Sequence, residues 1–471
     1  MPALNRHSRF LGCVIAMFTP VLSLAAAVAP PPMKIQQHQL KNGLKIVLAE
    51  DQSRPVANLQ IWYHVGSKDE RPGRTGFAHL FEHIMFRGSK NVGPEEHMRI
   101  VRESGGELNA YTSFDMTVYW ETFPSHYLER MLWLEADRMA SLEVTQENFT
   151  KEREVVKEER RVNYENPPYG LLIEDVLRNT YSSYPYKSPP IGSMDDINAA
   201  TIDDVREFHS TFYVPNNATL VLVGDFDSKN ALALIEKHFG AIPRGKPIPR
   251  VKTTEPARKA AAEATVRYPN APLAAVITSY LLPPMGHPDS YALEIASAIL
   301  STGQSSRLYK RLVYDERAAV AAFGQGQFLE GPSFFFGAAV ANQGKNIKEV
   351  ATSLEYTYAE MQKSPVTDDE MEKARNQFIA RFILGREGVQ AKADFLGRCA
   401  VLLGDPERYN TELAKYQAVT AADVQRVMKQ YLDPARQVKI WVEPGAAAAA
   451  GGGAGAGAGG GGGRGGRGRC G

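Results

Sequence analysis

The residues that could do chemistry in this chain lie within one run of five, His79-Leu80-Phe81-Glu82-His83. His79 and His83 are four residues apart, so on a helix both imidazoles project from one face and can share a tetrahedral metal ion. Glu82 stands beside them, and a carboxylate there can accept a proton from a water that the metal has acidified. The pattern HxxEH therefore predicts metal-assisted hydrolysis. The alternative is a helix face with two solvated or structurally paired histidines.

A short amphipathic helix is expected to carry these side chains. Over residues 76–86, apolar residues recur at positions i, i+3, i+4, i+7 and i+8, which is the spacing of one helix face. They are Phe77, Leu80, Phe81, Ile84 and Met85. Gly88 supplies a stop signal just beyond them. The helix therefore has a stripe of its own to bury in a core.

A metal held by two histidines needs a third ligand, which should be an inward-facing acid. Residues 145–164 are a predicted helix that is charged almost throughout, and by charge alone it would be a solvated helix. One face of it nevertheless collects its apolar residues together with two acids, namely Phe149, Glu152, Val155, Val156 and Glu159. A buried acid needs a partner or a metal. We expect Glu159 to be the third ligand and Glu152 to orient one imidazole, while Glu154 and Glu158 point away.

Predicted strands and helices alternate along the rest of the chain. The first half favours a hairpin around Asn42-Gly43, strands over 56–65, 107–112, 117–123 and 218–224, and helices over 94–103, 125–139, 145–164 and 228–239. Residues 240–262 are rich in proline and charge, and we interpret them as a linker. The second half favours strands over 274–281, 334–340 and 438–442, and helices over 290–300, 305–314, 347–362, 368–384 and 421–431. Two α+β halves of about 200 residues each are the predicted architecture.

The first 27 residues have the composition of an export signal. Arg6 and Arg9 form a basic start, an apolar stretch follows, and Ala25-Ala26-Ala27 fits the small-residue pattern at which such signals are cut. We therefore expect cleavage after Ala27 and a periplasmic or secreted protein with no stable membrane span. The alternative is an uncleaved anchor, because residues 10–29 are just long enough to cross a bilayer.

Composition bounds the classes of function. The chain has 471 residues, enough for two to four domains, and its formal net charge of +1 argues against a broad nucleic-acid face. Three cysteines exclude a disulfide framework. Residues 445–471 contain only Gly, Ala, Arg and Cys, and we expect a disordered tail. Its GRGGRGR run raises RNA binding as an alternative, but so few arginines without an aromatic residue favour a flexible appendage.

Taken together, these motifs resemble the pitrilysin/insulysin family of metallopeptidases, which includes the mitochondrial processing peptidases. HxxEH inverts the usual HExxH zinc motif, and a glutamate follows 76 residues after its last histidine. Five phrases match in order, at residues 76–88 (GFAHLFEHIMFRG), 105–112 (GGELNAYT), 152–159 (EREVVKEE), 215–225 (PNNATLVLVGD) and 303–312 (GQSSRLYKRL). The likeness covers about residues 36–443.

The resemblance implies one zinc ion per chain, with His79, His83 and Glu159 as ligands and Glu82 as the general base. It also implies that Asn109, Ala110 and Tyr111 lie on an edge strand that pairs with the substrate backbone, the alternative being an ordinary sheet strand. The fold implied is two similar domains, each a mixed, mainly antiparallel sheet packed with helices. Together they would form half of a clamshell chamber.

One place in the second half departs from the family pattern. Complete members have an Arg and, seven residues later, a Tyr that contact the substrate carbonyl region. The matching positions here are Val313 and Val320, and neither side chain can donate a hydrogen bond to a developing oxyanion. Arg317 and Tyr314 are nearby, but the shift in position changes their face. We therefore predict a heterodimer whose second, similar chain supplies the Arg and Tyr. A homodimer that tolerates the loss is the alternative.

The predicted function is a zinc endopeptidase that hydrolyses oligopeptides or unfolded polypeptide segments inside a closed chamber. The alternative is a non-catalytic peptide-binding or scaffold subunit, but a purely structural zinc site has no need of the base Glu82. The expected organisation is a signal peptide (1–27), an N-terminal zinc-binding peptidase domain (28–245), a similar C-terminal domain (246–444) and the tail (445–471).

Overall fold

The computed structural model describes residues 30–445. The predicted signal peptide lies outside the described residues, and so does the predicted tail apart from Gly445. The helices and strands all belong to the unit that begins at Pro32. No helix within residues 30–445 is both long enough and apolar enough to cross a membrane.

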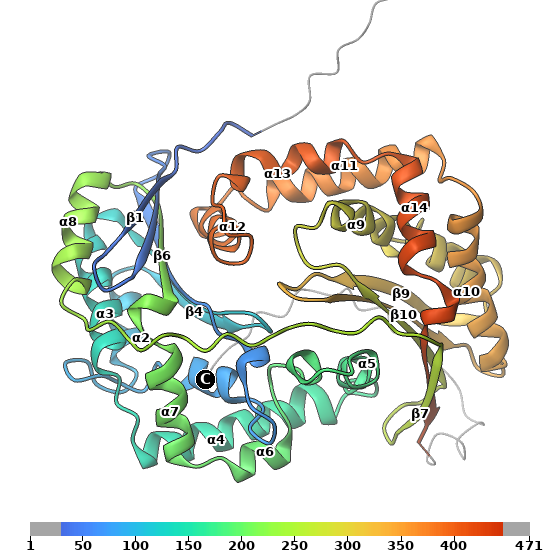
Figure 1. The fold of residues 1–471 in the computed structure, drawn as a ribbon, viewed down its shortest axis with the longest axis horizontal. Coiled ribbons are helices and arrows are strands. Elements are labelled where there is room, and N and C mark those ends of the chain that lie inside the picture. The colour runs from blue at the N-terminus through green and yellow to red at the C-terminus, as the bar shows by residue number, and fades with distance from the viewer. Residues whose placement is uncertain (1–29, 446–471) are drawn as a thin grey trace, which may run out of the picture. The chain divides into compact units, whose positions relative to one another are not determined.

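The first sheet has six strands in the order β1-β2-β6-β3-β5-β4 (Figure 1). Their bounds are β1 Gln36–Gln39, β2 Lys45–Glu50, β3 Val56–Tyr63, β4 Glu107–Thr112, β5 Thr117–Pro124 and β6 Ala218–Gly224. Only β2 and β6 pair in parallel. The predicted hairpin is confirmed, because β1 and β2 are antiparallel and Gly43 between them has a φ of 94°, in the region that favours glycine.

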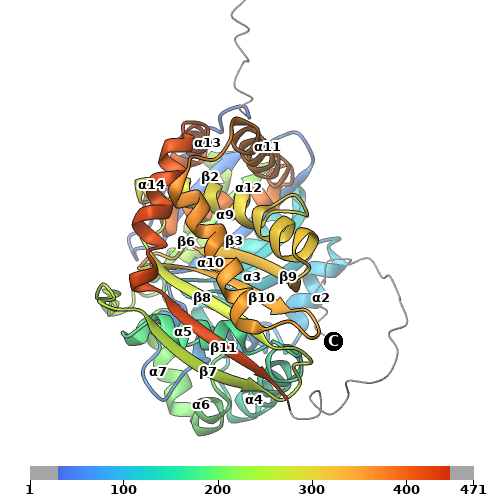
Figure 2. The same ribbon diagram turned by 90° about the vertical axis from the view of Figure 1, so that its right-hand side faces the viewer.

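The second sheet has five strands in the order β7-β11-β8-β10-β9 (Figure 2). Their bounds are β7 Ala262–Tyr268, β8 Ala275–Leu282, β9 Ala319–Gln327, β10 Ser333–Ala341 and β11 Val438–Pro444. β7 and β11 pair in parallel and the other pairs are antiparallel. The order therefore repeats that of β2-β6-β3-β5-β4, and the prediction of two similar, mainly antiparallel domains is confirmed.

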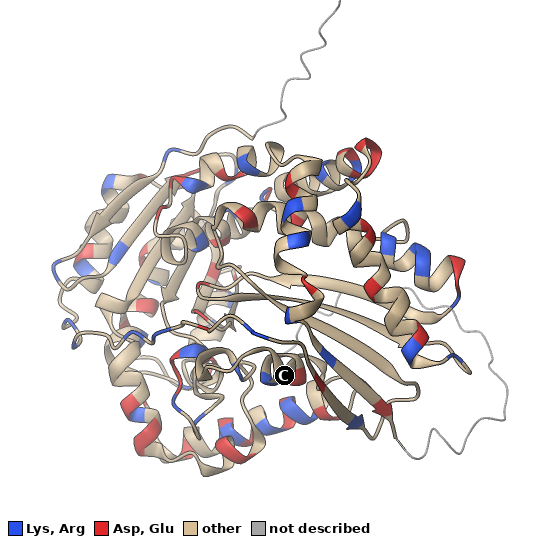
Figure 3. Ribbon diagram, turned by 45° about the vertical axis from the view of Figure 1, so that its right-hand side comes forward, with Lys and Arg blue, Asp and Glu red and all other residues tan. Residues whose placement is uncertain are grey.

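Helices cover both sheets. They are α1 Phe77–Ile84, α2 Glu96–Glu103, α3 Leu128–Ser141, α4 Gln146–Arg160, α5 Leu172–Thr180, α6 Met194–Ala199, α7 Ile202–Phe212, α8 Ser228–Phe239, α9 Pro288–Ser301, α10 Ile347–Lys363, α11 Asp368–Leu384, α12 Val389–Val401, α13 Arg408–Gln417 and α14 Ala421–Tyr431. The predicted helices lie within a few residues of these bounds, except that 305–314 is mostly a π-helical turn, Tyr309–Asp315. Lysine and arginine are interspersed with aspartate and glutamate along the helices in Figure 3.

One helix from each half of the chain packs on the sheet of the other half. α12 packs on the first sheet, where Leu396 joins Trp62 and Val221 in one buried cluster. At Gly397 a Cβ atom would lie 2.2 Å from the Trp62 indole, so only glycine allows this close approach. α5 packs on the second sheet, where Leu177 is buried with Ile277. The two halves are therefore joined by apolar burial on both sheets.

Candidate functional site

The HxxEH residues lie on α1, as predicted. The apolar stripe of this helix is buried, with every member at most 3% exposed. The helix begins after Gly76, whose N–H donates to Glu70 Oε2 at 3.0 Å, while the Ala78 N–H donates to Glu70 Oε1 at 2.9 Å. Glu70 thus satisfies backbone donors that the helix leaves free at its N-terminus. Burial raises the pKa of Glu70 well above its usual range, and these hydrogen bonds oppose the rise.

His79, His83 and Glu159 come together as one group. The Glu159 Oε2 atom lies 3.6 Å from His79 Nε2 and 3.4 Å from His83 Nε2. One ligand atom from each residue lies within 4.8 Å of the others. Two ligands about 2.0–2.1 Å from a tetrahedral zinc would be about 3.3 Å apart. Two imidazole nitrogens and a carboxylate oxygen are also a ligand set of catalytic zinc sites, so the residues fit the metal.

The two histidines have different electrostatic surroundings. Burial lowers the pKa of His79 to about 4, and the neighbouring His83 contributes to the shift. Burial acts in the same direction at His83, but hydrogen bonds to Glu152 and Glu159 outweigh it and raise the pKa of His83 to about 9. A metal ligand must be a neutral imidazole. Binding of a metal here is therefore expected to release a proton.

A hydrogen bond from a residue of the first sheet holds the Glu82 side chain in place. The Thr112 hydroxyl on β4 donates a hydrogen bond of 2.7 Å to Glu82 Oε2. Burial raises the pKa of Glu82, and the hydrogen bond from Thr112 opposes that shift. A carboxylate whose pKa moves towards neutrality is a better general base at neutral pH.

α4 places Glu152 and Glu159 as the sequence predicts, with one correction. Glu152 is 2% exposed, and its Oε2 lies 3.3 Å from His83 Nδ1. The side chain of Glu159 is 35% exposed, and Glu154 and Glu158 point outward. Val155, predicted to lie on the buried face, is 45% exposed. Each residue turns the helix by about 100°, so Val155 falls at the margin of a stripe that is narrower than predicted.

The strand with Asn109, Ala110 and Tyr111 is β4, at the end of the first sheet's strand order. Within residues 30–445, β5 is its only strand partner. The Ala110 N–H donates to the Asn109 side chain at 2.9 Å. The Tyr111 hydroxyl donates to Asp394 Oδ1 on α12 at 2.5 Å. The predicted strand is thus an edge strand that is also tied to the other half of the chain.

Sequence reasoning missed three residues that contact this site. Thr112 reaches Glu82, Arg87 forms an ion pair with Glu152, and Asp394 holds Tyr111. Arg87 lies three residues beyond the end of α1, so helical spacing gave no signal for it. Side chains alternate along a strand, so Thr112 shares a face with the buried Ala110. Asp394 gave no comparable signal.

A second group of ligand-type side chains comes from α2, β5 and α3. His97, Glu121 and Glu135 are all buried, and His97 Nε2 lies 2.5 Å from Glu121 Oε1. The buried Arg138 pairs with Glu135 and lies over the Tyr119 ring. Its guanidinium balances the charge of one acid, and burial raises the pKa of the other, Glu121, to about 7.

Val313 and Val320, which stand where the family pattern has an Arg and a Tyr, lie at the edge of the second sheet. Val313 is in the π-helical turn before β9 and is half-buried. Val320 is on β9 and is 49% exposed. β9 ends the strand order of its sheet, as β4 does in the first sheet.

Comparison with known proteins decides the family. Residues 45–193 match the description Insulinase (Peptidase family M16), and residues 199–378 match Peptidase M16 inactive domain. The chain is 32% identical over 410 residues to the zinc protease PqqE of Helicobacter pylori, which covers 86% of this chain and 92% of that protein. The chain belongs to the M16 insulinase family. The resemblance predicted from the sequence is thereby confirmed.

Solved structures of two proteases share the fold. A protease from Helicobacter pylori superposes with a TM-score of 0.83 at 32% identity, covering 88% of this chain and all of that one. The periplasmic protease PqqL of Escherichia coli superposes with a TM-score of 0.72 at 21% identity. That match covers 90% of this chain but 49% of PqqL, so this M16 chain corresponds to about half of the longer protein.

Proposed function

We propose that this protein is a zinc-dependent endopeptidase and that Glu82 is its general base. The observation that carries the proposal is the group of His79, His83 and Glu159, with Glu82 on the same helix and anchored by Thr112. The names of related proteins support it, because PqqE is called a zinc protease. A structural metal site has no use for a carboxylate placed in this way.

The roles of the side chains follow from their contacts. His79, His83 and Glu159 would hold the zinc ion, which when bound polarises a peptide carbonyl and acidifies a water. Glu82 accepts the proton of the attacking water and then delivers it to the leaving amine nitrogen. Glu152 accepts from His83 Nδ1, which leaves Nε2 free as the ligand atom.

The position of β4 at the edge of its sheet is the evidence for a peptide substrate. An extended peptide can add to a free strand edge through main-chain hydrogen bonds, which favours unfolded or short polypeptides over folded ones. Asn109, Ala110 and Tyr111 would supply this edge, and Thr112 on the same strand contacts the base. The proposed substrates are oligopeptides or unfolded segments enclosed in a chamber.

The proposed active form is a dimer. The chain matches about half of PqqL, and Val313 and Val320 stand where the family pattern has an Arg and a Tyr. A second, similar chain that supplies these two side chains would complete a chamber, and a homodimer is the alternative arrangement. We also propose export to the periplasm or secretion, which the predicted signal peptide and the periplasmic PqqL support.

Zinc analysis combined with peptide digestion tests the function. The purified protein should contain about one zinc per chain and cleave a library of quenched fluorescent peptides. A chelator should abolish cleavage and added zinc should restore it. Bound zinc and bound peptide without cleavage would instead favour the scaffold subunit. A rate that does not change when a co-purified chain is added would contradict the heterodimer.

A further inference from the structure

The buried carboxylate of Glu152 faces two basic groups, one on each oxygen. Its Oε2 lies 3.3 Å from His83 Nδ1, and its Oε1 lies 2.6 Å from Arg87 Nε. Glu152 is 2% exposed, so water does not screen its charge. A carboxylate in such a place is stable only when it is paired. Arg87 is therefore the partner that balances Glu152 on the side away from the metal ligand.

The backbone around Arg87 is fixed on both sides. Its N–H donates to the Ile84 carbonyl at 2.9 Å, and its own carbonyl accepts from the Asn148 side chain at 3.2 Å. Asn148 belongs to α4, the helix that carries Glu152. Gly88 follows with a φ of 107°, which turns the chain away immediately after Arg87. The guanidinium is thus presented to Glu152 from a defined position.

A second acid holds the other end of the guanidinium. Arg87 Nη1 lies 2.7 Å from Glu95 Oε1. Glu95 has a φ of 62°, a left-handed conformation that is uncommon for a residue with a side chain. Its N–H donates to the carbonyl of Phe86, the residue before Arg87. Strain of this kind persists where the surrounding structure requires it, often next to functional sites.

We propose that Arg87 is a positioning residue that acts on the metal ligand His83 through Glu152. This inference rests on the proposed zinc peptidase function. The contact with Arg87 aims the Glu152 carboxylate at Nδ1 of His83, so that Nε2 presents its lone pair to the metal. Loss of Arg87 would leave a buried carboxylate without its charge partner. Glu152 would then turn away, and His83 Nδ1 would lose its acceptor.

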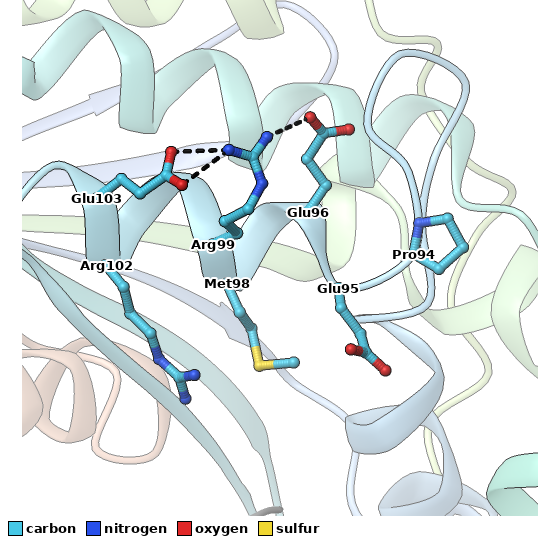
Figure 4. Close-up of a pocket in the computed structure, with 7 residues that line it drawn as sticks. All are labelled: Pro94, Glu95, Glu96, Met98, Arg99, Arg102 and Glu103. Atoms are coloured by element: carbon cyan, nitrogen blue, oxygen red, sulfur yellow. Dashed lines mark hydrogen bonds and ion pairs between the residues drawn. The ribbon is translucent and has the colours of Figure 1, made fainter.

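α2 offers a matched control in Arg99. Figure 4 shows its guanidinium between two carboxylates, those of Glu96 and Glu103, and each pair has an N–O distance of 2.7 Å. The Arg99 side chain is 54% exposed, compared with 26% for Arg87. Both arginines therefore bind two acids, but only Arg87 reaches the residue that contacts His83.

The experiment measures zinc affinity by competition with a chromophoric chelator, using the full chain and Zn²⁺ alone as the ligand. R87M should bind zinc about 10- to 100-fold more weakly than the unchanged protein, the usual effect of removing a group that supports a metal ligand. R99M should stay within about 2-fold. R87K, which keeps the charge, should recover most of the affinity. The Co²⁺-loaded R87M protein should show altered visible absorption bands.

A double variant separates positioning from a general loss of stability. If Arg87 acts through Glu152, R87M added to E152Q should weaken zinc binding no further than E152Q alone. Additive losses would overturn the proposal, as would R87M binding zinc within about 2-fold of the unchanged protein. Equal losses in R99M and R87M would also overturn it. If the unchanged protein binds no zinc, the proposed function itself is wrong.

Discussion

Thr112 on β4 and Glu82 on α1 share a hydrogen bond of 2.7 Å, in which the threonine hydroxyl donates to the carboxylate. The bond joins the edge strand proposed to hold the substrate to the side chain proposed to move the proton. Ala110 and Tyr111 precede Thr112 on the same strand. A peptide that pairs with β4 would therefore lie against the strand that fixes the base.

Thr112→Val should slow peptide hydrolysis without weakening zinc binding. Valine keeps the shape of threonine but removes a hydrogen bond to a charged group, which is worth about 1.5–3 kcal/mol. We expect kcat/KM to fall about 10- to 100-fold, with the zinc affinity unchanged. Steady-state kinetics and chelator competition measure the two quantities. Thr112→Ser, which keeps the hydroxyl, should retain most of the activity, and an equal loss in both variants would contradict this role of the hydroxyl.

Gly397→Ala should destabilise the contact between α12 and the first sheet. The added Cβ would lie 2.2 Å from the Trp62 indole, and overpacking of a core costs about 1–3 kcal/mol. Gly388, just before α12, has open space around its Cβ position and a φ of −84°. Gly388 is the N-cap of α12, where alanine is less favourable than glycine, so Gly388→Ala should cost no more than about 1 kcal/mol, without any clash. Urea unfolding of both variants measures the difference, and equal stabilities would contradict the packing described for α12.

Acid should weaken an ion pair between the halves of the chain. Glu330, in the turn between β9 and β10, lies 2.8 Å from His64 and also pairs with Lys68. Burial opposes ionisation, but His64 and Lys68 outweigh it and lower the pKa of Glu330 to about 2. The pKa of an unfolded glutamate is about 4.3, so this stabilisation is complete above about pH 4.3 and is lost as the pH falls towards 2.

Glu330→Gln tests this pH dependence. The difference in unfolding free energy between the unchanged protein and the variant should be constant above about pH 5 and shrink between about pH 4.3 and 2. Measurement with a chelator present keeps metal loss out of the comparison. A difference that stays constant down to about pH 2.5 would show that Glu330 is not held in its charged form.

The parts of the site that the sequence predicts are those fixed by local periodicity. The positions of His79, Glu82 and His83 follow from helical spacing alone, and Glu159 follows from the stripe on α4. The same stripe misplaced Val155, because charged residues leave few apolar positions to define the face. The role of Thr112 was not predicted, because its contact with Glu82 joins a strand to a helix 30 positions earlier in the chain.

The fold shows the same division between local and distant information. The strand order of the two sheets agrees with two similar α+β halves. No pattern in the sequence predicted α5 or α12. Each packs on the sheet of the other half, so its apolar face is explained by residues far away in the chain. Local patterns identify a helix, but they do not say which sheet it will cover.

The most direct test of the zinc endopeptidase proposal is Glu82→Gln. Glutamine keeps the size of the side chain and can still accept from Thr112, but it cannot take a proton from water. Peptide hydrolysis should fall by about 10²- to 10⁴-fold, which is the usual contribution of a general base, while the zinc content stays near one per chain. Hydrolysis within a few-fold of the unchanged protein, with zinc bound, would remove Glu82 from the mechanism and contradict the account.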